Sequence, residues 1–93
     1  MAVSIRIPTI LRTYTGDASE VTVEPTTPTL AGVIEALEVA APGISARVLD
    51  ESGQLRRFVN IYVDDDDVRF TDGLATPVGD RSSVSIIPAV AGG

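Results

Sequence analysis

Apolar and polar residues alternate along several short stretches of the chain. In residues 3–7, valine and isoleucine alternate with serine and arginine, a period of two that is typical of a strand with one buried face. Residues 58–63 and 84–87 are equally strand-like, and shorter runs at 21–23 and 68–70 predict two further strands. The pattern therefore predicts five strands, two before residue 24 and three after residue 57.

Between these two groups of strands the period changes to that of a helix. The apolar positions that recur at i, i+3, i+4 and i+7 are Leu30, Val33, Ile34 and Leu37. We expect Thr27 to cap this helix with Pro28 at its first position, and Pro42-Gly43 to end it. Residues 44–49 predict a further short turn of helix.

The remaining segments predict turns. Residues 13–19 are polar and include Gly-Asp, which indicates a hairpin loop. Residues 64–67 are four consecutive aspartates and are expected to form a charged turn, and residues 74–79 are expected to be irregular. The element order β-β-α-β-β-β implies an α+β domain over residues 1–87, with the helix packed on one face of a mixed sheet. The first and last strands are expected to pair in parallel at its centre. This order resembles the β-grasp fold.

The alternation assigns each strand residue to one face of the sheet. The residues expected to face the helix are Val3, Ile5, Ile7, Val59, Ile61, Val63, Val84 and Ile86. The residues expected on the opposite face are Arg6, Phe58, Asn60, Tyr62 and Ile87. Exposed apolar residues are common on protein surfaces, but a cluster of them beside a functional segment is typical of a docking surface. Both interpretations of the outer face remain open.

The chain ends in a tail of small residues, 88–93. It consists of Pro88, Ala89, Val90, Ala91, Gly92 and Gly93. Residues without a Cβ fit a channel too narrow for side chains, and such a tail presents its terminal carboxylate to a partner's active site. The alternative is a frayed terminus without function.

Composition narrows the chemistry. The chain has no Cys and no His, which excludes thiolate nucleophiles, common zinc sites and Ser-His or Cys-His catalysis. Its net charge is −6, which argues against nucleic-acid binding and favours a basic protein partner. No apolar run reaches membrane-spanning length, and the N-terminus lacks the features of a signal peptide, so we expect a cytoplasmic protein.

Two charged segments have competing interpretations. Asp64 to Asp67 offer oxygen ligands for a hard cation, but adjacent residues in a tight turn seldom converge on one ion. A solvated hairpin tip is therefore expected, and no metal site. Arg56-Arg57 are expected to be solvent-exposed loop residues, with pairing to a partner's acidic groups as the alternative.

Several segments together resemble the ubiquitin-like bacterial sulfur carriers of the ThiS/MoaD family, and in particular its CysO-type members. The resemblance covers the whole chain and is carried by residues 7–12 (IPTILR), 57–63 (RFVNIYV), 67–70 (DVRF), 73–76 (GLAT) and 88–93 (PAVAGG). Many relatives have Gly-Asp before the last strand, where this chain has Arg81-Ser82, which weakens the expected turn.

The resemblance implies a carrier that other enzymes act on, rather than an enzyme. An E1-like enzyme would use ATP and Mg²⁺ to adenylate the Gly93 carboxylate, and a sulfur donor would convert it to a thiocarboxylate. The chain itself would bind no cofactor. The implied partners are this activating enzyme, a sulfur-accepting biosynthetic enzyme and a metalloprotease that trims the tail or releases product. The alternatives are a modifier conjugated to lysines through Gly93 and an interaction module with an inert tail.

Overall fold

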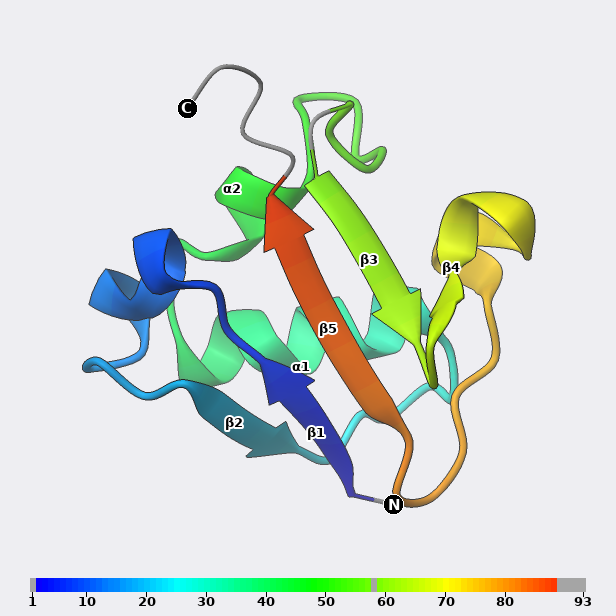
Figure 1. Cartoon of the computed structure of the whole chain (residues 1–93), viewed down its shortest axis with the longest axis horizontal. Coiled ribbons are helices and arrows are strands. Elements are labelled where there is room, and N and C mark those ends of the chain that lie inside the picture. The colour runs from blue at the N-terminus through cyan, green and yellow to red at the C-terminus, as the bar shows by residue number, and fades with distance from the viewer. Residues whose placement is uncertain (1, 58, 89–93) are drawn as a thin grey trace.

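Five strands form one mixed sheet in the computed structural model, which describes residues 2–57 and 59–88 (Figure 1). The strands are β1 (Val3–Arg6), β2 (Glu20–Val23), β3 (Val59–Val63), β4 (Asp66–Asp67) and β5 (Ser83–Pro88). Their order across the sheet is β2-β1-β5-β3-β4. β1 and β5 pair in parallel at the centre, and the other three pairings are antiparallel. The predicted β-grasp arrangement, with parallel first and last strands, is confirmed.

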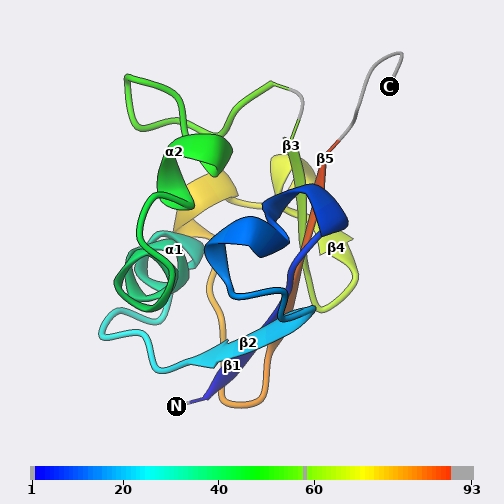
Figure 2. The ribbon, with the colours of Figure 1, turned by 90° about the vertical axis from the view of Figure 1, so that its left-hand side faces the viewer.

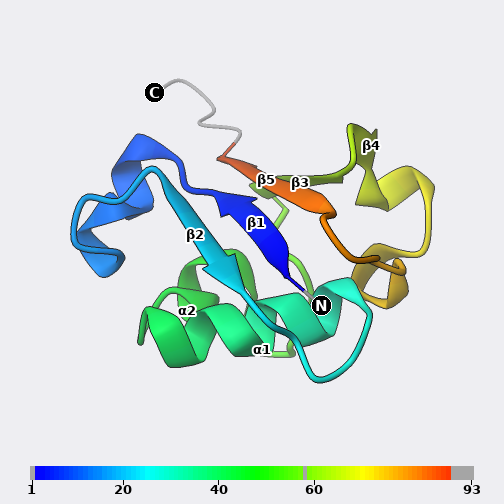
Figure 3. The same cartoon turned by 90° about the horizontal axis from the view of Figure 1, so that it is seen from below.

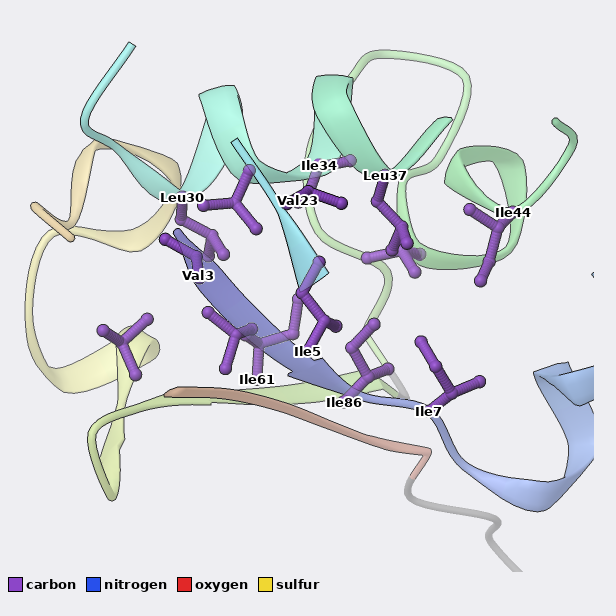
Figure 4. Packing of buried hydrophobic residues seen from close by; sticks show 14 of the residues in the cluster. Val3, Ile5, Ile7, Val23, Leu30, Ile34, Leu37, Ile44, Ile61 and Ile86 are labelled. Carbon is purple, nitrogen blue, oxygen red and sulfur yellow. The ribbon is translucent and has the colours of Figure 1, made fainter. Parts of the chain in front are cut away.

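One face of the sheet is covered by α1 (Leu30–Ala40), with the short α2 (Ser45–Val48) beside it, and the other face is left open (Figure 3). The helical stripe points into the sheet, and the aliphatic side chains of β1, β3 and β5 meet it (Figure 4). Leu30 and Leu37 are at most 1 % exposed. All eight strand residues predicted to face the helix are buried, because a period of two keeps them on one side.

The helix begins two residues later than the sequence predicts. Thr29, not Thr27, is the N-cap, and its hydroxyl accepts a hydrogen bond from the amide of Gly32. The reason is tertiary pairing of the preceding segment: the Pro28 carbonyl accepts from the Val78 amide at 3.0 Å, and the Leu30 amide donates to the Thr76 carbonyl at 2.9 Å. These bonds accompany an extended Thr29, a conformation typical of an N-cap.

The turn after α1 is held to the helix by the side chain of Glu38, which belongs to α1. Glu38 accepts hydrogen bonds from the amides of Gly43 at 2.8 Å and Ser45 at 2.9 Å. These two bonds hold the pKa of the Glu38 carboxyl below its usual value. The turn predicted at Pro42-Gly43 therefore lies where expected, and α2 confirms the short helix predicted in residues 44–49.

The connection from β1 to β2 is more ordered than the predicted loop. A 3₁₀-helix, Thr9–Tyr14, occupies its first half, and it buries Leu11 against the core. The hairpin-loop prediction for residues 13–19 is thus wrong at its start. Short 3₁₀ turns are common connectors that leave little periodic signal.

The aspartate run is divided between a turn and a strand. Asp64 and Asp65 have φ angles of 50° and 74°, which is the backbone of a two-residue hairpin turn that aspartate tolerates. Asp66–Asp67 then form β4. The prediction of a strand at residues 68–70 is wrong: Val68–Phe70 is a 3₁₀-helix, capped by the Asp67 carboxylate, which accepts from the Arg69 amide at 2.9 Å.

The connection from β4 to β5 contains a further 3₁₀-helix, after Val68–Phe70, and a strained turn. Gly73–Ala75 is helical, which corrects the prediction that the segment from residue 74 is irregular throughout. Ahead of β5, Arg81 has a φ of 67°, so the chain makes the turn with a non-glycine residue in the left-handed region. Within residues 2–57 and 59–88, no helix is both long and apolar enough to cross a bilayer.

Candidate docking face and tail attachment

The open face of the sheet carries one row of side chains that crosses all five strands. Strand register places Arg6 opposite Glu20 on β2 and opposite Ser85 on β5, and Tyr62 opposite Ser85 and Asp67. With neighbouring strands about 4.8 Å apart, Arg6 and Tyr62 lie about 10 Å from each other across the small Ser85. Arg6 is exposed and Tyr62 half-buried. An arginine and a tyrosine, two residue types enriched at interfaces, therefore lie on either side of the small Ser85.

A second row lies nearer the end of β5. Asn60 is directly opposite Ile87, which is 48 % exposed. The Asn60 amide oxygen accepts a hydrogen bond from the Arg69 guanidinium. Of the predicted docking residues, the structure thus brings Arg6, Asn60, Tyr62 and Ile87 together on one face. Phe58 lies outside the described residues.

Arg69 holds the edge of this face. Beyond Asn60, its guanidinium donates to the main-chain carbonyls of Arg56, Arg57 and Val59 at 2.7 to 3.0 Å. One side chain from the connection after β4 therefore fixes the segment that leads into β3. The side chain of Arg56 in turn donates to the Ala46 carbonyl at 3.0 Å, so this arginine joins the same segment to α2.

An open groove of about 730 Å³ runs between this face and the 3₁₀-helix that follows β1. It is lined by Arg6 and Arg12, by the acidic Glu20 of β2, by Ser85 to Ile87 of β5, and by residues of the β1–β2 connection. The Arg12 guanidinium also donates a hydrogen bond to the Ile7 carbonyl at 3.2 Å, and this bond restrains the Arg12 side chain. The groove therefore places two cationic side chains beside the last residues of β5.

The predicted tail begins where this groove ends. Pro88 is the last residue of β5 and is opposite Val59. Ala89 to Gly93, including the predicted reactive Gly93, lie outside the described residues. The central position of β5 means that the chain leaves the sheet between β1 and β3, with the docking residues on both sides.

One aspartate of the β3–β4 turn, Asp64, has structural partners. The Asp64 carboxylate accepts from the Ser83 amide at 2.9 Å and from the Ser82 hydroxyl at 3.1 Å, and the Asp64 amide donates to the Ser83 carbonyl. Asp64 therefore joins the hairpin to the start of β5. In the part of the chain that the structure describes, no three Asp or Glu residues are grouped so as to hold a metal ion.

Sequence reasoning did not identify Ser85, Arg12 or Arg69 as part of this region. Ser85 was predictable, since it lies between the inward-facing Val84 and Ile86 and two residues before Ile87, which places it on the same face as Ile87. Arg69 was not, because its partners are main-chain carbonyls 10 to 13 residues earlier in the chain. Its only sequence signal is its position in the segment 67–70.

Comparison with known proteins agrees with this arrangement. The model of the ThiS family matches residues 5–93. The sulfur carrier protein CysO of Mycobacterium tuberculosis is 54 % identical over 95 residues, which cover 100 % of both chains. Small archaeal modifier protein 3 of Haloferax volcanii is 35 % identical over 65 residues, 70 % of each chain.

Solved structures show the same similarity. A chain in the crystal structure of the Amycolatopsis orientalis BexX/CysO complex superposes with a TM-score of 0.88 at 46 % identity, covering 98 % of this chain and 99 % of that one. The crystal structure of Mycobacterium tuberculosis CysO gives a TM-score of 0.86 at 52 % identity, covering 95 % and 99 %. The chain therefore belongs to the ThiS family of ubiquitin-like sulfur carrier proteins.

Proposed function

We propose that this protein carries sulfur as a thiocarboxylate on Gly93. The observation that supports this most strongly is the identity of 54 % to a sulfur carrier protein over the whole of both chains. The composition is consistent with it, because a chain without cysteine has no thiol on which to carry sulfur. The protein is then a cosubstrate of other enzymes, and we place its action in the cytoplasm.

The proposed cycle begins with activation of the terminus. A carboxylate is a poor electrophile because it is anionic at neutral pH. An E1-like enzyme, using ATP and Mg²⁺, lets the Gly93 carboxylate attack the α-phosphorus of ATP and releases pyrophosphate. Sulfide sulfur then attacks the carbonyl carbon of the acyl adenylate, and AMP leaves. The resulting thiocarboxylate donates sulfur to the substrate of a biosynthetic enzyme, on the way to cysteine or another sulfur-containing metabolite.

The chain's own contribution is to present the tail and to dock. Pro88 leaves the sheet at its centre, and Arg6, Tyr62 and Ile87 lie on the face beside it. A partner seated on this face receives the tail directly. Small residues from Ala89 onward suit a narrow channel, which would keep water from the acyl adenylate. The net charge of −6 favours a partner with a basic surface.

The test is ATP-dependent thiocarboxylate formation with the cognate activating enzyme and sulfide, measured by intact mass. The wild-type chain should exchange one oxygen for sulfur. Deleting Gly93, replacing Gly92 with Phe, or adding one residue after Gly93 should each abolish the exchange without changing thermal stability, because the tail lies beyond the last core strand. A Gly93-deleted chain that acquires sulfur at the wild-type rate would refute the proposal.

A second candidate is conjugation to lysine side chains through the same adenylated Gly93. The identity of 35 % to a small archaeal modifier protein favours it. This route needs the same terminus and the same activating chemistry, but an amine replaces sulfide as the nucleophile. An isopeptide adduct on other proteins would identify it, whereas the carrier route leaves the chain unconjugated.

A further inference from the structure

The edge of the sheet formed by β2 has free main-chain groups. β2 pairs with β1 on one side only. The bond from the Ile7 amide to the Ser19 carbonyl makes residues 7 and 19 a hydrogen-bonded pair, and pairs of this kind alternate along an antiparallel ladder. Val21 and Val23 therefore bond to β1, and the amide and carbonyl of Thr22 point outward from the sheet. Among the described residues, no loop or turn donates to or accepts from Thr22.

A groove of about 470 Å³ lies beside this edge and is lined by residues of β2 and α1. Figure 2 shows β2 in front, with α1 beside it. Its floor is apolar and small, with Gly32, Ala36 and Ala40 contributed by the helix. Val39 is 84 % exposed at its rim. An added strand would thus find main-chain partners on one side and an apolar wall on the other.

The charges of the groove have one sign. Glu24 and Glu35 line it and are both exposed, and no arginine is among the described residues that line it. Acidic side chains at a sheet edge oppose pairing with a second copy, because the same charges would face each other. They attract a cationic chain instead.

We propose that the β2 edge is a second docking surface, which binds an extended basic segment of another protein by strand addition beside α1. Thr22 supplies the main-chain bonds, the small helical residues accept apolar side chains, and Glu24 and Glu35 select positive charge. The surface lies two strands away from β5, so its occupation leaves the end of β5 accessible. It does not depend on thiocarboxylate chemistry, and the carboxylate form of the protein is sufficient to test it.

The experiment is an NMR titration of the ¹⁵N-labelled full chain with a capped six-residue peptide that alternates valine and arginine. The amide signals of Thr22, Glu24, Gly32 and Val39 should shift together, and the affinity should fall as salt is added. A peptide with glutamate in place of arginine should not bind. Shifts centred on another surface, or none at millimolar peptide, would overturn the proposal.

Charge and main-chain pairing are tested separately. The double variant Glu24→Arg, Glu35→Arg should bind about tenfold more weakly or worse at low salt. The matched control Glu51→Arg, Asp72→Arg changes the net charge equally at sites away from the groove and should bind like the wild type. Equal losses in both double variants would mean that only net charge matters, and would overturn the site.

Main-chain pairing is tested with two further peptides, each N-methylated at one alternating set of amides. Only one set faces β2 in an added strand, so one peptide should bind like its parent and the other should lose binding. Equal binding of the two would contradict strand addition. Thermal unfolding of each protein variant identifies any that fail to fold.

Discussion

The two faces of the sheet are built from the same strands but have different partners. The inner face carries valine and isoleucine from β1, β3 and β5, and all of them pack on the stripe of α1. The outer face carries Arg6, Asn60, Tyr62, Ser85 and Ile87, and at one edge Asn60 accepts a hydrogen bond from the Arg69 side chain. The difference indicates that the covered face provides stability and that the open face is available for other proteins. Substitutions on the two faces should therefore separate stability from association.

The largest effect is expected on the covered face. Leu37→Ala leaves a cavity at a position that is 1 % exposed, and should lower the free energy of unfolding by about 2–5 kcal/mol. That is a large share of the roughly 5–14 kcal/mol expected for a domain of this size. Urea denaturation measures it, with Ser85→Ala on the open face as the control, expected within about 0.5 kcal/mol of wild type. A loss below about 1 kcal/mol for Leu37→Ala would contradict the assignment of the core.

The next effect is on recognition. Ile87→Asp places a charge on a half-exposed apolar residue of the open face, and should weaken binding to the activating enzyme by about tenfold or more, since apolar anchors dominate interfaces. Calorimetric titration measures the affinity. Ala46→Asp, which adds the same charge at an exposed position of α2 on the covered side of the sheet, is the control and should bind this enzyme normally. If both variants bind alike and keep the same unfolding midpoint, the open face is not the docking surface.

Arg69 bears on both stability and recognition, because its hydrogen bonds position the residues at the edge of the open face. Arg69→Ala removes its bonds to Asn60 and to three carbonyls, and should cost about 1–2 kcal/mol, as water replaces part of what is lost. Chemical denaturation tests this against Arg57→Ala, whose side chain donates no described hydrogen bond. Equal stabilities of the two variants would show that the Arg69 side chain does not stabilise this edge of the face.

The smallest effect concerns the turn before β5. Arg81→Gly relieves a φ of 67° and should raise the unfolding free energy by several tenths to about 1 kcal/mol, because the strain relieved exceeds the entropy that glycine adds. Asp80→Gly should do the opposite, since the Asp80 carboxylate accepts from the Ala2 amide at 3.1 Å. A destabilised Arg81→Gly would show that the turn is not strained.

The residues of both faces could be predicted from the sequence, but the contacts that the open face makes could not. Alternation and helical spacing report burial, so every inner position from Val3 to Ile86 was assigned correctly. The N-cap at Thr29, the 3₁₀-helix at Val68–Phe70 and the Arg69 contacts depend on main-chain partners distant in sequence. Local pattern carries no information on such pairings. The outer-face residues were assigned only from their alternation with buried residues. Which of them lie side by side in rows depends on the register between strands, and the sequence does not give that register.

The same limit applies to chemistry. The absence of cysteine and histidine excluded whole classes of site, and the final glycines indicated where a reaction could take place. In the proposed cycle the partner enzyme determines the sulfur acceptor, and no pattern within this chain encodes the identity of that acceptor. Membership of the ThiS family supports a carrier role.

The most direct test of the central claim is the intact mass of the protein isolated from the cells that make it, under conditions that preserve thiocarboxylates. If the protein is a sulfur carrier, a fraction of the chain should have one oxygen replaced by sulfur, located at Gly93 by fragmentation. A population found only as isopeptide adducts to lysines would establish the modifier role instead. A population found only as the free carboxylate, even when sulfide and the activating enzyme are abundant, would contradict the sulfur-carrier account.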